Sequence, residues 1–588
     1  MGKNLPLPFY AQRRCTRVVH VGKVGIGGDD PVRVQSMITC DTMDTEASIA
    51  ESRALAEVGC EIVRITAPTV KDARNLQSIR DGLRAAGCDV PLVADIHFKP
   101  EAALESAKWV EKVRVNPGNY ADSKKFNVRE YSDQEYAEEI GRIRERFAPL
   151  VKLCQERGVA MRIGTNHGSL SDRIMNRYGD TPLGMVESAL EFARIARESG
   201  YHDFVFSMKA SNPKVMIAAY RLLVARLSAE GPNWNYPIHL GVTEAGDGED
   251  GRIKSAVGIG SLLADGIGDT IRVSLTEDSV HEIPVAKELA ALFAGNCEGW
   301  TALEKLSFDP FAYARRETEK LTINGVSLGG DEVPRVVVTR KHYDAVAHKL
   351  AGLGDFQPEL VYEDLPVIEI DPRDVAAVSE VNARLESCLV TVKDKIDLPV
   401  IAAFRLLAAE IGARHPILLK DSLDPRPDPQ ASFVPTLLAA SARLGSLLCD
   451  GIGDAVLLRS EEAPGQGLRL AYNILQAVGA RIFKTDYVAC PSCGRTLFNL
   501  QETTARIKAA TRHLKGVKIA IMGCIVNGPG EMADADFGYV GGAPGKVNLY
   551  VGKKAVKFNI PEGEAVDRLV DLVKEHGRWF EAKEKAEV

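Results

Sequence analysis

The sequence predicts an α/β protein with an N-terminal (β/α)8 TIM barrel, an inserted, degenerate barrel-like α/β domain and a C-terminal α+β domain. Eight β-rich runs alternate with helical patterns up to about residue 295, which predicts the barrel. A ten-residue repeat predicts the insert, and a change of pattern after residue 483 predicts the last domain. We therefore divide the 588 residues into 1–295, 296–482 and 483–588.

The strand candidates of the barrel are short and rich in β-branched residues. They are VRVQSM (32–37), EIVRIT (61–66), PLVADIH (91–97), KVRVNPG (112–118), AMRIGTN (160–166), FVFSMKA (204–210), PIHLGVTEA (237–245) and TIRVSL (270–275). The helical segments between them include 45–59 and 181–200, and the second ends at Gly200 as a helix C-cap does. A doubly wound open sheet is the alternative, but it usually has fewer strands and a glycine-rich first turn, and no G-x-G-x-x-G follows the first strand here.

Polar side chains recur near the C-terminal ends of these strands, which is where barrel enzymes build their active sites. Residues i and i+2 of a strand point to the same face, so each strand offers a pair of such positions. The cations at these positions are Arg64, Arg114, Arg162, Lys209 and Arg272. The other polar candidates are Asp95, Asn116, Asn166, Glu244 and Ser274.

Five buried cations need partners, and only Asp95 and Glu244 are evident as acids. Unpaired buried charge is costly, so an anionic ligand explains the cations better than five structural ion pairs do. Arginine forks match the oxygens of phosphate or diphosphate. The sequence therefore predicts a pocket for a phosphate-bearing small molecule.

The composition limits the other partners. The net charge is −7, which argues against bulk nucleic acid or an anionic membrane surface as a partner. No run approaches the roughly 18 apolar residues of a membrane helix, and the N-terminus lacks the apolar core of a signal peptide. We expect a cytoplasmic protein in which most of the eleven cysteines are free thiols.

The repeat marks the inserted domain. GSLLADGIGDTIRVS (260–274) reappears as GSLLCDGIGDAVLLRS (445–460), and the first ten positions differ only at Ala264 and Cys449. The insert thus contains a degenerate copy of the last barrel unit. Because Leu457 takes the place of Arg272 and the strand ends lack the barrel's cations, we interpret the insert as a spacer or interface domain without an anion site. A second active site is the alternative.

Three cysteines in the C-terminal domain are candidate metal ligands. Cys490 and Cys493 form C-x2-C, and Cys524 follows after thirty residues with no fourth cysteine at a matching interval. A structural zinc site usually closes with a fourth Cys or His, whereas the residues near Cys524 are oxygen donors: Asn527, Glu531 and Asp534. Three thiolates with an oxygen ligand suit a [4Fe-4S] cluster. The spacing favours a cluster over zinc and zinc over a redox dithiol, and all three stay open.

Taken together, these motifs resemble the 4-hydroxy-3-methylbut-2-en-1-yl diphosphate synthase family, the iron–sulfur enzymes of the non-mevalonate isoprenoid route. The resemblance rests on VQSM (34–37), VADIHF (93–98), RVNPGN (114–119), RIGTNHGSL (162–170), HLGVTEAG (239–246), DGIGDTIRVSL (265–275), CPSCGR (490–495) and GCIVNGPGE (523–531). These motifs cover both end domains, and the insert resembles the long, three-domain form of the family.

The resemblance implies an activity and a set of residues. The family opens and dehydroxylates 2-C-methyl-D-erythritol 2,4-cyclodiphosphate with two electrons, which come from ferredoxin or flavodoxin. Its [4Fe-4S] ligands correspond to Cys490, Cys493, Cys524 and Glu531. Its diphosphate pocket corresponds to Arg64, Arg114, Asn116, Arg162, Asn166, Lys209, Arg272 and Ser274.

Two carboxylates are given catalytic roles by hypothesis. Glu244 supplies the proton with which the hydroxyl leaves as water, or it only balances the cations; Glu531 is a labile ligand. The cluster domain must close over a barrel mouth, and the sequence is compatible with a chain that caps itself and with a homodimer. A non-redox barrel enzyme with a structural zinc domain, and a binding protein whose metal module docks a partner such as RNA, are the rival functions.

Overall fold

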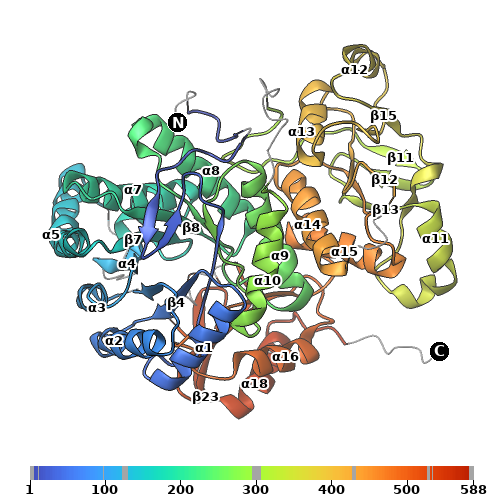
Figure 1. Cartoon of the computed structure of the whole chain (residues 1–588). Helices are drawn as coiled ribbons and strands as arrows, with labels where there is room; N and C mark the ends of the chain where they lie inside the picture. Colours follow the sequence, from blue (N-terminus) through green and yellow to red (C-terminus); the bar gives the residue numbers. More distant parts are fainter. Residues whose placement is uncertain are drawn as a thin grey trace.

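The computed structural model of the chain (Figure 1) describes residues 5–10, 12–96, 98–121, 130–294, 306–426, 432–525, 530, 532 and 534–581. Its N-terminal part is a closed barrel of eight parallel strands in the order β8-β7-β6-β5-β4-β3-β10-β9, and a bridge between Phe206 and Ile238 completes the ring. The strands are β3 (Arg33–Met37), β4 (Ile62–Thr66), β5 (Leu92–Asp95), β6 (Lys112–Val115), β7 (Ala160–Asn166), β8 (Phe204–Lys209), β9 (His239–Leu240) and β10 (Thr270–Ile271). The barrel is confirmed, and each of its strands lies within a predicted run, although β9 and β10 are only two residues long against predictions of 237–245 and 270–275.

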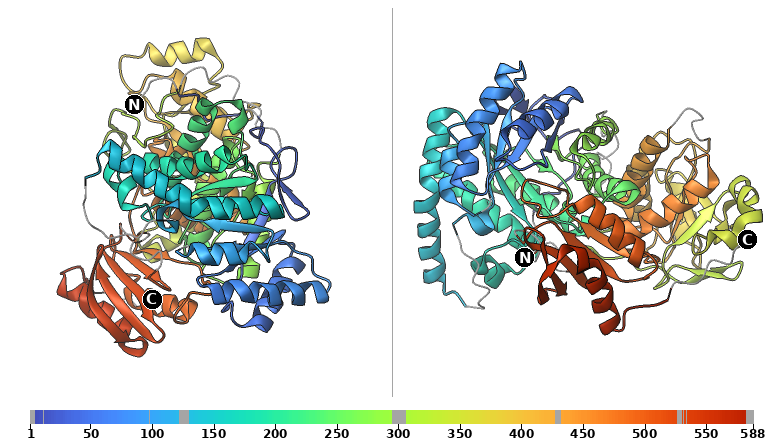
Figure 2. Two further views of the ribbon diagram at one scale, coloured as in Figure 1. Left: turned by 90° about the vertical axis from the view of Figure 1, so that its left-hand side faces the viewer. Right: turned by 90° about the horizontal axis from the view of Figure 1, so that it is seen from below.

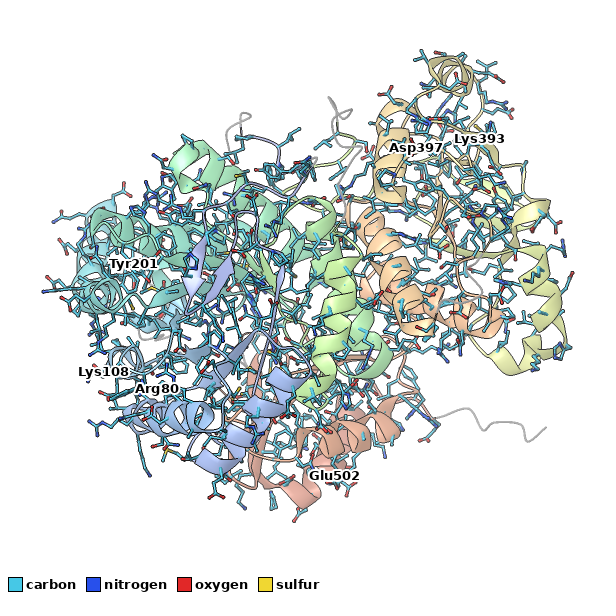
Figure 3. The ribbon with its side chains drawn as sticks, viewed as in Figure 1. Arg80, Lys108, Tyr201, Lys393, Asp397 and Glu502 are labelled. Carbon is cyan, nitrogen blue, oxygen red and sulfur yellow. The ribbon has the colours of Figure 1, made fainter. Side chains whose placement is uncertain are left out.

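Helices surround the barrel, and side chains fill the space between the helices and the strands (Figure 3). The main ones are α1 (Thr45–Glu57), α2 (Val70–Ala85), α3 (Pro100–Ser106), α5 (Asp133–Arg157), α7 (Pro182–Glu198), α8 (Pro213–Glu230), α9 (Gly248–Ala264) and α10 (Glu282–Ala291). Helix α7 begins where the Thr181 side chain accepts from Gly184 N, and it ends before Gly200, which has a φ of 70°.

A small hairpin closes the N-terminal end of the barrel. Strands β1 (Val19–Val21) and β2 (Val24–Ile26) pair antiparallel, and their apolar side chains pack against the first residues of the barrel strands, including Ile62 and Ala160. The bottom of the barrel is therefore sealed by apolar contacts, and access is from the opposite end.

The insert repeats this layout with two strands fewer. A hairpin, β11 (Leu321–Ile323) and β12 (Val326–Leu328), precedes six parallel strands in the order β14-β13-β18-β17-β16-β15, in which a single bridge joins β17 to β16. These strands are β13 (Arg335–Val338), β14 (Leu360–Val361), β15 (Ile368–Ile370), β16 (Val390–Val392), β17 (Leu418–Lys420) and β18 (Ala455–Leu457). The segment is a further α/β unit, as predicted.

A second repeat, not recognised in the sequence analysis, explains the matching hairpins. PFYAQRRCTRVVHVGKVGIGGDDPVRV (8–34) corresponds to PFAYARRETEKLTINGVSLGGDEVPRV (310–336). The copies make the same contacts: Thr16 Oγ1 donates to Asp269 at 2.9 Å, and Thr318 Oγ1 donates to Asp454 at 2.9 Å. The insert is therefore a duplicate of the barrel that retains both of its ends.

The barrel and the insert meet through equivalent helices, α9 and α14 (Phe433–Cys449), which lie side by side in Figures 1 and 2. Ser261 Oγ and Ser446 Oγ, at the same position of the two copies, are 2.7 Å apart. The two copies thus meet as the subunits of a symmetric dimer do. The same surface of each copy contacts the other.

Four fully buried charges cross this interface. Arg221 of α8 contacts Asp265 and Asp450, both at 2.8 Å. Arg405 of α13 (Val400–Glu410) contacts the same two carboxylates at 2.8 and 2.6 Å. Each arginine bridges both halves, so the quartet requires the insert and the barrel to be docked.

The C-terminal part, here called the cysteine domain, is a five-stranded mixed sheet in the order β19-β20-β21-β22-β23, with two helices on one face. Its elements are β19 (Asp486–Ala489), α16 (Leu500–Thr511), β20 (Lys518–Met522), β21 (Phe537–Ala543), β22 (Lys546–Val551), β23 (Lys554–Pro561) and α18 (Glu562–Glu575). The continuous β-rich run 547–560 is a hairpin and not one long strand, because Gly552, with a φ of 54°, turns the chain between β22 and β23. The boundaries at 295 and 482 stay predictions.

Among the described residues, no helix combines the length and the apolar character that crossing a membrane requires.

We expect the buried quartet to hold the insert against the barrel. Replacement of Asp450 by Ala leaves Arg221 and Arg405 each short of a partner, and should lower the free energy of unfolding by about 3–5 kcal/mol. Chemical denaturation of purified protein measures it. As a matched control, Glu156→Ala removes the exposed Lys152–Glu156 pair and should cost under about 0.5 kcal/mol; equal effects of the two changes would contradict the prediction.

Candidate active site

One pocket lies between the C-terminal ends of the barrel strands and the cysteine domain. The described residues that line it come from both parts of the chain: Met37, Arg64, Asp95, Arg114, Arg162, Asn166, Lys209, Thr243, Glu244, Arg272, Ser274, Cys490, Pro491, Cys493, Arg495, Met522 and Cys524. Twelve of the fourteen residues predicted for the site are in this set. Of the other two, Asn116 is buried and caps helix α4 (Pro117–Tyr120), where its side chain accepts from Gly118 N, and Glu531 lies outside the described residues.

Asp95 is the carboxylate around which the arginines gather. Arg114 contacts it at 3.1 Å, Arg162 at 3.8 Å and Arg64 at 3.9 Å. One negative charge thus serves three buried guanidinium groups of the barrel. The site is therefore strongly electropositive, which supports the predicted preference for an anion.

Arg272 has a partner that the sequence analysis missed. It contacts Glu282, at the start of α10, through Nε and Nη2, each at 3.1 Å. The view that only Asp95 and Glu244 can balance the cations is therefore wrong. Glu282 lies ten residues beyond Arg272 in the chain and belongs to a helix. The spacing of residues within the strands therefore could not indicate it.

Among the described residues that line the pocket, Lys209 is a cation whose charge is not balanced by an ion pair. It is 4% exposed, and no ion pair of Lys209 is found among the residues that the structure describes. A Cβ atom on Gly241 would lie 2.7 Å from its Nζ, so this glycine of the HLGVTEAG motif leaves room for the ammonium group. Burial, together with Arg64 and Arg162, lowers the pKa of Lys209 well below its usual value.

The interior of the barrel beneath these cations is also polar. Lys112 and His239 are fully buried, and Lys112 Nζ and both ring nitrogens of His239 have no hydrogen-bond partner among the described residues. Burial and the cations above lower the pKa values of both groups. Positive charge is thus disfavoured throughout this interior until an anion binds above it.

The cysteine domain packs on the barrel of its own chain. Ala245 and Ala489 form a parallel β-bridge, which sets Glu244 beside Cys490. The Thr276 hydroxyl donates to the Cys490 carbonyl at 3.2 Å, and Lys254 contacts Asp486 at 2.9 Å. The chain can therefore cap itself, one of the two arrangements that the sequence allowed.

The three cysteines line the pocket but do not form a compact ligand set. All ten cysteines in the described part of the chain are free, as predicted, and no three Cys, His, Asp or Glu side chains there are grouped closely enough to hold a single metal ion. A cubane cluster is larger than one ion and takes one ligand at each iron, so three spread thiols fit it better than they fit zinc. Burial raises the pKa of Cys490 well above normal and so favours the neutral thiol, whereas coordination to a metal deprotonates a thiol.

Arg495, in the CPSCGR motif, is a pocket residue that the sequence analysis did not select. Its Nη2 lies 4.0 Å from Asp95, so the cysteine domain adds a cation to the barrel's set. Burial opposes its charge, but Cys493, Asp95 and Cys524 outweigh burial and raise the pKa of Arg495. Its position directly after C-x2-C was the available signal.

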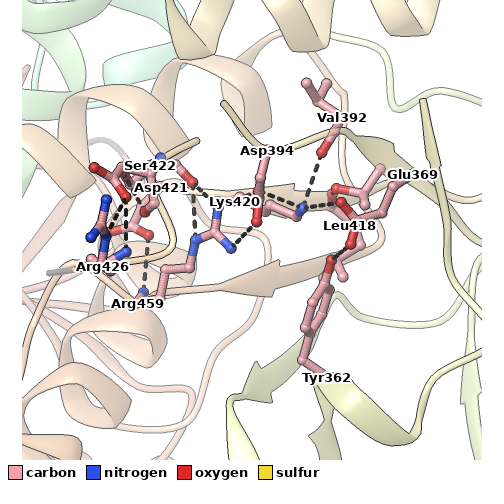
Figure 4. A network of polar contacts seen from close by, with 12 residues as sticks. Tyr362, Glu369, Val392, Asp394, Leu418, Lys420, Asp421, Ser422, Arg426 and Arg459 are labelled. Atoms are coloured by element: carbon pink, nitrogen blue, oxygen red, sulfur yellow. Dashed lines mark hydrogen bonds and ion pairs between the residues drawn. The ribbon is translucent and has the colours of Figure 1, made fainter. Parts of the chain in front are cut away.

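At the corresponding strand ends of the insert, the cations pair with carboxylates of the insert itself (Figure 4). Lys420 contacts Asp394 at 2.9 Å and Glu369 at 3.4 Å, and Arg459 Nη1 contacts Asp394 at 2.9 Å. The expectation that these strand ends lack cations is wrong, because Lys420 ends β17 and Arg459 occupies the position of Ser274. Their carboxylate partners leave no excess of positive charge, which supports the predicted absence of an anion site.

Fold and site together define a class of protein: a (β/α)8-barrel enzyme with clustered cations at its strand ends beneath a cysteine-bearing domain. Two family models match the chain, the GcpE TIM-barrel domain over residues 16–287 and the GcpE protein C-terminal domain over residues 486–575. The chain belongs to the family of 4-hydroxy-3-methylbut-2-en-1-yl diphosphate synthases (flavodoxin).

Relatives with that name match nearly the whole chain. The protein of Akkermansia muciniphila is 60% identical over 582 residues, which cover 98% of this chain and 99% of that one. The protein of Chlorobaculum tepidum is 43% identical, covering 98% and 91%, and that of Leptospira interrogans is 46% identical, covering 97% and 98%. The insert is therefore shared with these relatives.

Because Lys209 has a depressed pKa in the free protein, binding of an anion should raise that pKa and draw in a proton. Titration calorimetry with sulfate, which stays fully ionised, at pH 8 in buffers of different ionisation heat should show uptake of up to about one proton. Lys209→Met should reduce the uptake. Lys508→Met, which removes a cation that pairs with Asp247 outside the pocket, should leave the uptake unchanged; heats that do not depend on the buffer would contradict the prediction.

Proposed function

We propose that the chain reduces 2-C-methyl-D-erythritol 2,4-cyclodiphosphate to (E)-4-hydroxy-3-methylbut-2-enyl diphosphate, with flavodoxin as the electron donor. The family assignment supports the reaction and the donor. The observation that carries the proposal is that one pocket is lined both by cations suited to a diphosphate and by three cysteines. An anion and a redox group can therefore meet without any further rearrangement of the chain.

The barrel residues bind and orient the substrate. Arg64, Arg114 and Arg162 surround one carboxylate and have donors to spare for diphosphate oxygens, while Lys209 supplies a point charge. Asn166 accepts from Arg114 at 3.1 Å and helps to fix the direction of that guanidinium. The anion supplies the charge that this part of the pocket lacks, so its binding is favoured by the folded structure itself.

Cys490, Cys493, Cys524 and Glu531 are the proposed ligands of a [4Fe-4S] cluster. Such a cluster would supply electrons one at a time and a Lewis-acidic iron for the departing oxygen. The chain contributes the pocket that both domains line: the bridge at Ala245 and Ala489 joins the cysteine domain to the barrel beside it.

Glu244 is the proposed proton donor to the hydroxyl that leaves as water. Its side chain is 5% exposed, and its backbone has a φ of 51°, a left-handed conformation that is uncommon outside glycine. This conformation lies directly before the bridge to the cysteine domain, so the fold holds the carboxyl at the junction between the two halves of the pocket.

We further propose that the insert acts as a spacer that keeps the cysteine domain over its own barrel. The buried quartet fixes the insert on α8 and α9, and the chain passes from α15 (Pro464–Ala477) directly into β19. The internally paired charges of its mouth favour this role over a second active site.

The first test is anaerobic purification followed by iron and sulfide analysis. About four irons and four acid-labile sulfides per chain are expected, with an EPR signal after reduction that changes when the cyclodiphosphate is added. One zinc per chain without sulfide would instead support a non-redox barrel enzyme with a structural metal domain.

The proton-donor role of Glu244 is tested by its replacement with Gln, which keeps the size of the side chain but removes the acid. Turnover should fall by about 10²- to 10⁴-fold, while the iron content and the substrate-induced EPR change remain. Normal turnover in Glu244→Gln would show that this carboxylate only balances charge.

A further inference from the structure

Met37 contacts two cations of the pocket through its sulfur atom. It is the last residue of β3, is 2% exposed and lines the pocket. Arg64 Nη2 and Arg272 Nη1 both donate to Met37 Sδ, each at 3.0 Å. These two nitrogens are therefore no more than about 6 Å apart, although they belong to like charges that repel each other.

The order of the barrel strands sets this sulfur between the two arginines. Strand β3 lies between β4, which carries Arg64, and β10, which Arg272 directly follows. Met37 and Arg64 are partners in the register of β3 and β4. Because partners in neighbouring parallel strands lie side by side on the same face of the sheet, the fold brings the thioether to the guanidinium groups.

The thioether can orient the two arginines without neutralising them. Each arginine also meets a carboxylate: Asp95 lies 3.9 Å from Arg64 Nε, and Glu282 lies 3.1 Å from Arg272 Nε. A further carboxylate between the arginines would pair with both, whereas a methionine sulfur is a neutral and weak acceptor. Burial, with Arg272 nearby, lowers the pKa of Arg64 to about 10. The sulfur thus leaves the positive charge available to a ligand.

The duplicate of this unit in the insert has none of the three side chains. The register of β13 and β14 repeats that of β3 and β4. Thr339, Tyr362 and Leu457 stand at the positions of Met37, Arg64 and Arg272. Thr339 caps helix α11 (Arg340–Val346) instead. The sulfur and both arginines are therefore absent together from the strand ends that are predicted to bind no anion, as expected of groups that work as one unit.

We propose that Met37 is a positioning residue, whose sulfur holds Arg64 and Arg272 as a pair that binds one phosphate group of the substrate. Each of the two nitrogens carries two hydrogens, so one can stay on the sulfur while the other reaches a phosphate oxygen at about 2.9 Å. The pair meets the phosphate already oriented, so less side-chain freedom is lost on binding. This rests on the proposed function only for the identity of the anion.

Two substitutions of Met37 separate this role from packing, with calorimetry on oxidised holoenzyme as the measurement. Met37→Leu keeps an apolar side chain of similar volume but removes the acceptor. It should bind sulfate and the cyclodiphosphate about 10-fold more weakly. Met37→Gln supplies a neutral oxygen acceptor and should recover most of the affinity. A packing role predicts the reverse order, because burial of an amide costs more than burial of leucine, and that order would overturn the proposal.

Steady-state kinetics and a double substitution give independent readouts. A contact that the substrate and the transition state share acts on KM, so Met37→Leu should raise KM about 10-fold and leave kcat within about threefold. Arg272→Gln leaves the sulfur with one arginine, so adding Met37→Leu to it should weaken binding less than in the wild type. Equal losses in the two backgrounds would show that Met37 acts independently of Arg272.

The matched control is Met161→Leu, in the barrel strand β7. Met161 is fully buried among apolar side chains and does not line the pocket. The same exchange of residue types there should leave the affinity within about twofold. Iron and sulfide content is measured for each variant. If Met37→Leu loses its cluster, Met37→Gln decides alone: an affinity within about threefold of the wild type supports the proposal, and a greater loss overturns it.

The outcomes separate this inference from the proposed function. If the wild-type protein binds the cyclodiphosphate and Met37→Leu binds it as tightly, the positioning role is wrong while the proposed reaction stands. If the wild-type protein binds sulfate but not the cyclodiphosphate, the proposed function fails, and the sulfate affinities of the variants still test the positioning role.

Discussion

The excess of positive charge at the barrel mouth is the constraint on which the rest of the structure depends. Three guanidinium groups share Asp95, Arg272 takes Glu282, and Lys209 has no ion pair among the described residues. Polar and ionisable groups continue into the barrel at Lys112 and His239, where most barrels have apolar layers. Such an interior is stable only because the helices, the N-terminal hairpin and the cysteine domain enclose it, and because an anion can complete it.

The duplicated insert shows how small a change separates a binding site from a structural one. Both mouths carry cations at strand ends, but in the insert Asp394 and Glu369 lie beside Lys420, and Asp394 also pairs with Arg459. Each cation there has a nearby carboxylate, so an added anion would have to displace one. The chemical difference therefore lies in the placement of acids as well as in the loss of the cation that Leu457 replaces.

The sequence predicted the features that depend on local patterns of neighbouring residues. Short β-rich runs located all eight barrel strands, and the strand-end positions together with the cysteine spacing supplied the twelve of fourteen predicted site residues that line one pocket. What it missed depends on contacts between distant segments. Glu282 reaches Arg272 from a helix, Arg495 enters from another domain, and Asn116 caps α4 and is not among the residues that line the pocket. The hairpin at Gly552 has only a weak signal in the sequence, because GKK interrupts a β-rich run without a strong turn motif.

The pairing of α9 with α14 has a consequence for how the protein behaves on dilution. An interface between separate subunits is lost below its dissociation constant, whereas two halves joined in one chain keep a high effective concentration at any protein concentration. Covalent joining also releases the two faces from symmetry: a change at Asp265 is no longer repeated at Asp450, so each can be altered and compensated alone. One half can thereby change at its strand ends while the other keeps its own.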